Sequence, residues 1–320
     1  MGNSQKKKWF VILNPHAGSD RGKKDRAEIL NRLSKTGFHY ELAVSEYQKH
    51  TVQLTIQAIE KGFRNLIVAG GDGTLNEVVN GIFSQTVCAP EEITIGMVPV
   101  GTGNDWIKTF GIPNFYKSAV KIIKQGKTMR QDVGRITFTE NDLTKTCYFA
   151  NMAGFGFDAM VAAKTNRLKD KGRTGIMLYL QALGSSFLNY KTAKTQVVID
   201  GQDINELIFS ISIGIGKFNG GGMMQAPGAI PDNGHFQVTI IRKIDFFGIL
   251  RNLAGLYSGE FVKDPRVSTH EARNIFISSA YNIAGEADGE TLGDNKFEID
   301  IISQKLTVIF NPEKYLKFVL

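Results

Sequence analysis

One segment, Gly70-Gly71-Asp72-Gly73-Thr74-Leu75-Asn76-Glu77, combines glycines, a carboxylate and a hydroxyl in a pattern suited to phosphate chemistry. It follows the apolar run 65–69, which is typical of a buried strand, and it precedes 77–83, which predicts a helix. Glycines let the backbone approach a phosphate closely, and the free N–H groups at a helix start favour anions. Because bare phosphate would repel Asp72, this carboxylate indicates a bridging metal ion or a proton to be moved. The alternative is a glycine turn with an N-capping Asp.

Two further glycine loops follow predicted strands. Asn14-Pro15-His16-Ala17-Gly18 ends the apolar run 9–13, and Val98-Pro99-Val100-Gly101-Thr102-Gly103-Asn104-Asp105 ends the run 93–99. The carboxyl ends of parallel strands share one edge of a sheet, and ligands gather there. We therefore expect the three loops to converge on a common site.

The second half of the chain carries a pair of carboxylates and a glycine run. Asp288 and Glu290 flank Gly289, and residues at i and i+2 can hold a metal ion or supply a base that deprotonates a hydroxyl. A solvated hairpin turn is the alternative. The run Gly220–Gly222 either lets backbone approach a ligand or forms a tight crossing between strands.

Common nucleotide-binding signatures do not fit. Residues 18–24 imitate a phosphate-binding P-loop, but the glycine spacing is one residue short and no Ser or Thr follows the Lys. The dinucleotide pattern G-x-G-x-x-G has Asn76 or Trp106 where its last glycine belongs. A dinucleotide-dependent dehydrogenase is therefore poorly supported.

Strands and helices alternate over about the first 130 residues, which predicts a doubly wound parallel sheet. The expected strands are 9–13, 40–45, 66–69 and 93–99, and the expected helices are 22–35, 50–61, 77–83 and 116–125. From about residue 133 the pattern is typical of a β-rich domain. Its expected strands are 135–139, 146–152, 195–200, 209–215, 236–241, 274–278, 297–302 and 306–310, interrupted by helices over 176–187 and 246–256.

The composition is that of an ordinary globular protein, with 42% hydrophobic and 22% charged residues in 320. No run of 18 apolar residues exists, so no membrane span is expected. The net charge of +7 suits anionic partners such as nucleotides, nucleic acid or an anionic membrane surface. The basic residues between 164 and 173 are interpreted as a solvated face or as a contact with lipid headgroups. The two cysteines, Cys88 and Cys147, suggest a reducing compartment.

Together these motifs resemble the diacylglycerol kinase catalytic family, which includes sphingosine, ceramide and bacterial lipid kinases. The resemblance runs through the whole chain in order. The residues that carry it are Asn14–Gly18, Gly70–Glu77, Pro99–Asp105, Asp132–Gly134, Asn151–Asp158, Gly220–Pro227 and Asp288–Glu290. It implies a nucleotide-binding α/β domain over 1–133, similar to those of NAD kinase and phosphofructokinase. A β-sandwich lipid-substrate domain over 134–304 follows, with 305–320 returning to the first domain and the active site in the cleft between the domains.

The resemblance also implies which residues form the site. Glu290 would be the proton acceptor, with Asp288 beside it, and Asp72 would help to hold a catalytic Mg²⁺. The residues expected to contact ATP are Asn14, Pro15, His16, Ala17, Gly18, Ser45, Gly70, Gly71, Asp72, Gly73, Thr74, Leu75, Asn76 and Thr102.

Four positions depart from the family pattern. Lys49 stands where relatives usually have Gly, Ser45 stands where they have Thr, and Trp106 replaces Phe. Bacterial relatives bind a structural metal ion through an Asp and neighbouring backbone carbonyls. The corresponding residues are Ile230, Asn233 and His235, and Asn233 takes the place of the Asp.

The implied function is transfer of the ATP γ-phosphate, assisted by Mg²⁺, to a lipid hydroxyl. Diacylglycerol is the first expected acceptor, ahead of a sphingoid base or ceramide. NAD kinase, which shares the Gly-Gly-Asp-Gly-Thr element, is a rival, and a non-catalytic nucleotide or lipid sensor is a third reading. The expected location is cytoplasmic, with peripheral contact to an anionic membrane and no nucleic-acid partner, and a homodimer stays open.

Overall fold

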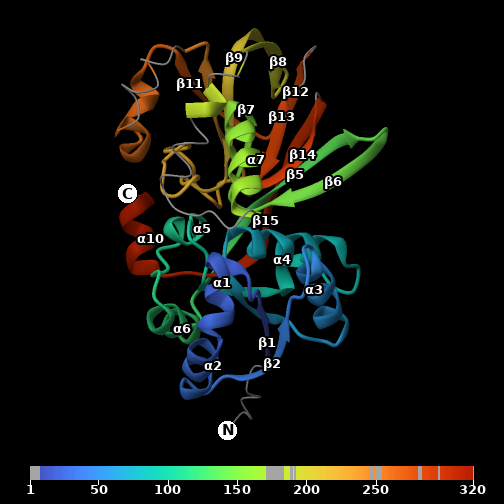
Figure 1. Ribbon diagram of the computed structural model, residues 1–320, viewed down its shortest axis with the longest axis vertical. Helices are drawn as coiled ribbons and strands as arrows, with labels where there is room; N and C mark the ends of the chain where they lie inside the picture. Colours follow the sequence, from blue (N-terminus) through green and yellow to red (C-terminus); the bar gives the residue numbers. More distant parts are fainter. Residues whose placement is uncertain are drawn as a thin grey trace. The chain divides into compact units, whose positions relative to one another are not determined.

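The computed structural model describes residues 8–170, 184–187, 190, 192–244, 248, 254–279, 283–294 and 296–319. The chain divides into two compact units (Figure 1). The first comprises Met1–Gln131 and Gln304–Leu320, and the second comprises Asp132–Ser303. The predicted helices over 176–187 and 246–256 and the end of the basic segment 164–173 lie largely outside the described residues.

The first unit alternates strands and helices along the chain. Its elements are β1 (Lys8–Leu13), α1 (Ala17–Lys24), α2 (Arg26–Lys35), β2 (His39–Val44), α3 (His50–Glu60), β3 (Asn65–Gly70), α4 (Asp72–Ser84), the 3₁₀ turn η1 (Pro90–Glu92), β4 (Thr94–Pro99), α5 (Trp106–Thr109), α6 (Tyr116–Gln125) and α10 (Pro312–Val319). The start of β5 (Thr128–Glu140) and the end of β15 (Lys296–Ile309) also belong to this unit.

Its sheet is parallel, in the order β2-β1-β3-β4-β15. Apolar side chains alternate between the two faces of the buried strands. Trp9, Val11 and Leu13 of β1 pack with α2 and α6, whereas Phe10 packs against Phe63 after α3. Burying both faces of a parallel sheet under helices is the doubly wound arrangement predicted from the sequence.

The last residues of the chain return to this unit. The end of β15 pairs with β4 through Thr307 and Val308, and the Asn311 N–H donates to the Phe110 carbonyl at 3.0 Å. Tyr315 of α10 stacks on the ring of Phe110.

Helix α4 begins five residues earlier than the sequence pattern predicted. Its first residue is Asp72, with Gly71 extended at the N-cap, so Asp72–Asn76 form the opening turns of the helix rather than a loop. The pattern-based prediction started the helix at Glu77 because glycine disfavours helix interiors. Here the helix gains its first turns from Leu75 and Val78, which are buried against the sheet.

Lys49, the residue before α3, has a left-handed backbone with φ of 66°. The Glu77 carboxylate accepts hydrogen bonds from the backbone N–H groups of Lys49 and Thr51, at 3.0 and 3.1 Å, and so holds this conformation. A left-handed backbone costs a side-chain-bearing residue about 1–2 kcal/mol, whereas glycine adopts it freely.

We expect Lys49→Gly to raise the free energy of unfolding by about 0.5–1 kcal/mol, because glycine removes this strain but loses more entropy on folding. Equilibrium urea unfolding would measure the change. Lys61→Gly is the matched control, because Lys61 is an exposed residue after the same helix with φ of −73°. A Lys49→Gly variant no more stable than wild type would show that the strain is relieved elsewhere.

The second unit is built almost entirely of strands. Besides the remainder of β5 and β15, it contains β6 (Leu143–Phe149), β7 (Met152–Gly156), α7 (Phe157–Asp170), β8 (Ala193–Ile199), β9 (Gln202–Gly214), β10 (Phe236–Arg242), the 3₁₀ turn η2 (Glu260–Lys263), β11 (Val267–Ala272), β12 (Asn274–Ser279), β13 (Ala284–Ala287) and β14 (Glu290–Asp294). No helix among the described residues is long and apolar enough to cross a bilayer.

One hydrophobic core joins these strands. Side chains from β5, β7, β9, β10, β12 and β15 meet in it, with Phe155 against Phe297 and Phe149 against Phe236. The strand pairs are antiparallel, in the order β14-β13-β7-β9-β8-β12-β15, with β10 and β11 continuing from β9. An antiparallel β unit and a parallel α/β unit in one chain match the predicted fold class.

Candidate active site

The three glycine loops of the first unit meet at the carboxyl ends of its parallel strands. A Cβ added to Gly18 would lie 2.1 Å from the Val100 carbonyl oxygen, and one added to Gly71 would lie 3.0 Å from Gly101 Cα. Side chains at Gly18 and Gly71 would therefore push the loops apart. The predicted convergence of the loops is present within this unit.

The first loop turns sharply between β1 and α1. Gly18, Ser19 and Asp20 all have a left-handed backbone, with φ of 64°, 59° and 64°. Asn14 anchors the loop, because its Oδ1 accepts the His16 N–H at 2.9 Å and its Nδ2 donates to Thr74 Oγ1 at 3.0 Å. The hydrogen bond to Thr74 ties this loop to the start of α4.

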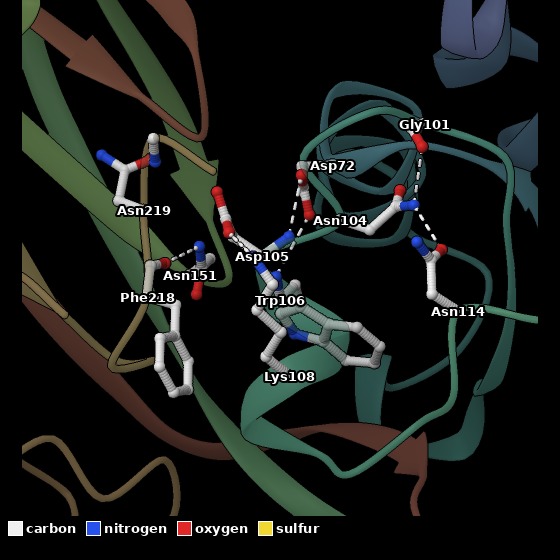
Figure 2. Close-up of polar contacts among 11 residues, drawn as sticks. Asp72, Gly101, Asn104, Asp105, Trp106, Lys108, Asn114, Asn151, Phe218 and Asn219 are labelled. Carbon is white, nitrogen blue, oxygen red and sulfur yellow. Dashed lines mark hydrogen bonds and ion pairs between the residues drawn. The ribbon is translucent and has the colours of Figure 1, made fainter. Parts of the chain in front are cut away.

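Asp72 holds the third loop in place. Its two carboxylate oxygens accept the backbone N–H groups of Asp105 and Trp106, each at 3.1 Å, at the start of α5 (Figure 2). On the far side of the loop, Asn104 Nδ2 donates to the Gly101 carbonyl at 2.7 Å and to Asn114 Oδ1 at 2.8 Å. The loop is fixed at both sides and leaves Thr102 exposed between them.

Asp105 is a second carboxylate at this place, which the sequence-based list of site residues omitted. A Cβ on Gly103 would lie 3.4 Å from Asp72 Oδ2 and 3.5 Å from Asp105 Oδ2, so both carboxylates flank Gly103. Asp105 is buried and forms an ion pair with Lys108 one helical turn later. Its position directly before an apolar helix in the third glycine loop was the signal available in the sequence.

The remaining residues that were predicted to contact ATP differ in how far their side chains are exposed. Ser45 follows β2 and donates its N–H to the Leu13 carbonyl at 3.0 Å, so it lies at the same sheet edge as the loops. Thr74, Leu75 and Asn76 are buried, with exposed fractions of 4%, 2% and 6%. These three therefore shape the start of α4 by packing, and direct contact from their side chains to a nucleotide is not favoured.

In the second unit, Asp288 binds backbone rather than presenting a free carboxylate. Its Oδ2 accepts the Ala150 N–H at 2.8 Å, and its Oδ1 accepts the N–H groups of Asn151 and Met152 at 3.0 and 2.9 Å. Three N–H donors satisfy most of the acceptor capacity of a carboxylate. We therefore revise the sequence-based role of Asp288 from proton acceptor or metal ligand to a residue that positions its turn.

Glu290 begins β14, immediately after this turn. Asp288 and Gly289 have φ of 48° and 88°, as a two-residue type I′ hairpin requires, and Ala287 pairs with Glu290 across it. Glu290 is partly exposed, in contrast to Glu286 of the opposite strand, which pairs with Thr291 and of which 2% is exposed. The local sequence suggested a solvated turn, but the structure shows that two carboxyl groups secure it.

In the segment Ile230–His235, hydrogen bonds already engage the side chains that were expected near a structural metal ion. Asn233 Oδ1 accepts the His235 N–H at 3.0 Å, and the Asn233 carbonyl oxygen lies 3.1 Å from His235 Nδ1. Arg273 Nε donates to His235 Nε2 at 3.1 Å, so Nδ1 carries the proton and donates to Asn233. Each oxygen of Asn233 thus already accepts one hydrogen bond, and a guanidinium lies beside the loop.

Asp132 completes this loop without a metal ion. It is fully buried, its Oδ2 accepts the Gly234 N–H at 2.7 Å, and its own N–H donates to the Pro231 carbonyl at 2.7 Å. Mg²⁺ prefers charged oxygen ligands in an octahedral arrangement. Asn233 offers only neutral oxygens to such an ion, and the metal ligands Ile230, Asn233 and His235 stay a prediction. The described part of the chain contains no group of three or more His, Cys, Asp or Glu residues placed to hold a metal ion.

We expect the midpoint of thermal unfolding, measured without nucleotide, to be the same in EDTA and in millimolar Mg²⁺. The reason is that hydrogen bonds already fix the 230–235 loop. Differential scanning calorimetry would test this, with Asn233→Asp as the comparison that restores a carboxylate ligand. A Mg²⁺-dependent midpoint in wild type that Asn233→Ala abolishes would show that the loop binds the ion.

Comparison with known proteins agrees with this geometry. Residues 8–136 match the family model of the diacylglycerol kinase catalytic domain, and residues 151–310 match that of the YegS C-terminal NAD kinase β-sandwich-like domain. A diacylglycerol kinase of Staphylococcus carnosus is 30% identical over 288 residues, which cover 89% of each chain. One from Staphylococcus aureus strain MRSA252 is 29% identical over 287 residues, which cover 89% of this chain and 86% of that protein.

Solved structures show the same fold. A diacylglycerol kinase from Bacillus anthracis strain Sterne superposes with a TM-score of 0.71 at 19% identity, over 97% of this chain and 99% of that one. Yeast NADH kinase in complex with NADH superposes with a TM-score of 0.56 at 11% identity, over 99% of this chain and 87% of that one. With both family models matched in order, this chain belongs to the diacylglycerol kinase family of lipid kinases.

Proposed function

We propose that this protein is an ATP- and Mg²⁺-dependent kinase that transfers the γ-phosphate to the free hydroxyl of diacylglycerol and produces phosphatidic acid. The observation that carries the proposal is the meeting of three glycine loops at one sheet edge, with Asp72 at the start of α4. Membership of the diacylglycerol kinase family supports a lipid alcohol as the acceptor.

The nucleotide phosphates would bind to backbone N–H groups. The first-turn N–H groups of α4 have no partner within the helix, and the helix dipole favours an anion there. The loop Asn14–Gly18 would close over the phosphates from β1, and Thr102 would add an exposed hydroxyl from the third loop. Because the loops hold one another, the phosphate position is fixed before the nucleotide binds.

Asp72 would hold the magnesium ion together with the phosphates and water, with Asp105 beside it. One or two carboxylates with substrate phosphates are the usual environment of Mg²⁺ in kinases. The Asp72 oxygens accept the N–H groups of Asp105 and Trp106, which orients the carboxylate at the start of α4. When bound, Mg²⁺ neutralises the charge that develops on the phosphates.

Glu290 would accept the proton of the acceptor hydroxyl as that oxygen attacks phosphorus. Asp288 would keep Glu290 in place through its three hydrogen bonds to residues 150–152. A positioned carboxylate serves as a general base without forming a covalent intermediate. The net charge of +7 supports peripheral contact with an anionic membrane, where the lipid acceptor is located.

Transfer of ³²P from γ-labelled ATP, with Mg²⁺, into mixed micelles tests the proposal. Separate micelles would contain diacylglycerol, sphingosine or ceramide, and free NAD would be offered in parallel. We expect label in phosphatidic acid. Label in sphingosine phosphate or ceramide phosphate would keep the lipid kinase and change the acceptor. Label only in NADP, or none with nucleotide binding established by calorimetry, would overturn the proposal.

A further inference from the structure

Glu286 is a buried carboxyl group that the proposed reaction does not use. It lies in β13, where it pairs with Gly154 of β7, and 2% of it is exposed. Its Oε2 accepts the Gly289 N–H at 2.7 Å. Gly289 separates Asp288 from Glu290, so Glu286 contacts the turn that carries the proposed base.

The same hairpin thus places two carboxyl groups on its turn. Asp288 fixes the turn to residues 150–152, and Glu286 fixes its second central residue from within β13. A Cβ on Gly154 would lie 2.9 Å from Glu286 Oε1, so β7 leaves room for this side chain only because it has glycine at that position. The side chain is confined on that side by backbone.

The groups that face Glu286 are acidic or neutral. Asp288 lies on its own hairpin and Asp158 on α7, and both raise its pKa, while Asn219 Nδ2 lies 3.5 Å from Oε1. Burial is the largest cause, and with the two acidic groups it raises the pKa of Glu286 to about 8, although the hydrogen bonds from Gly289 and Asn219 lower the pKa. The group is therefore neutral at pH 7. Ionisation would bury a charge beside two carboxylates, which opening of the turn would relieve.

We propose that Glu286 is a positioning residue for phosphoryl transfer, whose buried carboxyl group holds the Asp288–Gly289 turn and thereby orients Glu290. The effect of Glu286 on catalysis rests on the proposed function. The hydrogen bond from the Gly289 amide to Glu286 does not depend on which substrate the protein uses.

Three variants test the inference: Glu286→Gln, which mimics the neutral acid, Glu286→Leu, which removes the acceptor, and Glu271→Gln, which changes an exposed carboxylate of β11 in the same unit. The measurements are kcat and KM for ATP at pH 7 and 9, and hydrogen exchange of the Gly289 amide. A misplacement of a catalytic group by about 1 Å costs roughly 10²-fold in rate.

We expect Glu286→Leu to lower kcat by about 10²-fold with an unchanged KM for ATP, and to expose the Gly289 amide to exchange. Glu286→Gln should match wild type at pH 7 and exceed it at pH 9, and Glu271→Gln should follow wild type throughout. Unchanged kcat and amide protection in Glu286→Leu would overturn the inference. If Glu286→Leu does not fold, the inference would be overturned by Glu286→Gln having the same kcat and the same Gly289 amide protection as wild type at both pH 7 and pH 9.

Failure of the proposed function gives a different pattern. Wild type and Glu271→Gln would then transfer no phosphate to any lipid. The exchange experiment still decides the role of Glu286: Gly289 protection that falls between pH 7 and 9 in wild type, but not in Glu286→Gln, supports it. Protection that does not differ between wild type and Glu286→Gln at pH 9 contradicts it.

Discussion

Glu290→Gln is expected to lower the rate of phosphoryl transfer by about 10²–10⁴-fold, the usual contribution of a positioned general base. Glutamine keeps the size and shape of the side chain at the start of β14 but cannot accept the proton of the attacking hydroxyl. Asp288 holds the hairpin through hydrogen bonds to the backbone of residues 150–152, so the substitution should leave the turn in place and nucleotide binding should be retained.

The measurement is single-turnover transfer from labelled ATP, with nucleotide affinity from calorimetry on the same sample. Glu271→Gln is the control for loss of one carboxylate from the second unit, because Glu271 is exposed on β11. Wild-type turnover in Glu290→Gln on a true lipid substrate would remove Glu290 as the base. A loss of nucleotide affinity as large as the loss of rate would instead show that Glu290 contributes to nucleotide binding.

The parallel unit could be predicted well because local pattern and tertiary environment agree there. Helices α3 and α6 begin and end within a residue of the prediction, since each has a regular apolar stripe and a clear stop. The start of α4 was missed because Gly71 and Gly73 obscure a helix whose first turn is stabilised by burial of Leu75. Tertiary packing overrode intrinsic propensity at this position.

Strands of the second unit were harder to delimit. The expected strand 146–152 is two strands, β6 and β7, separated where Asp288 captures the backbone of residues 150–152. The expected strands 297–302 and 306–310 are one long strand, β15, in which Gln304 has φ of 52°. Both differences depend on pairing between residues distant in sequence, which a local pattern does not contain.

The candidate site was predictable in its motifs and less so in the roles of single residues. The convergence of the glycine loops follows from residue type and spacing, whereas the roles of Asp72 and Glu290 stay predictions that rest on these motifs and on the family resemblance. The engagement of Asp288 with three N–H groups and the burial of Glu286 depend on how β13 lies against β7. No spacing rule distinguishes a solvated carboxylate in a turn from one that is enclosed by strands, so these two roles emerged only from the structure.

The stability of the protein should fall with rising pH because of Glu286. In the folded state the pKa of this group is raised from its ordinary 4.5 to about 8, mainly by burial. The folded state therefore binds one more proton than the unfolded state between these pH values. The stabilisation by this proton is full below pH 4.5 and declines by up to about 1.4 kcal/mol per pH unit until pH 8.

Glu286→Gln removes this decline, because an amide does not titrate. We expect the free energy of unfolding of the variant, relative to wild type, to rise steadily from pH 5 to pH 8 and then to level off, as measured by urea unfolding at each pH. The buried Asp158, whose pKa is also raised by burial, is present in both proteins, so the part of its titration that does not depend on Glu286 cancels in the difference. The free energy of unfolding of Glu271→Gln should vary with pH in the same way as that of wild type. A difference that stays constant with pH would mean that Glu286 is ionised in the folded protein, and neutral anchoring of the Gly289 turn would then be untenable.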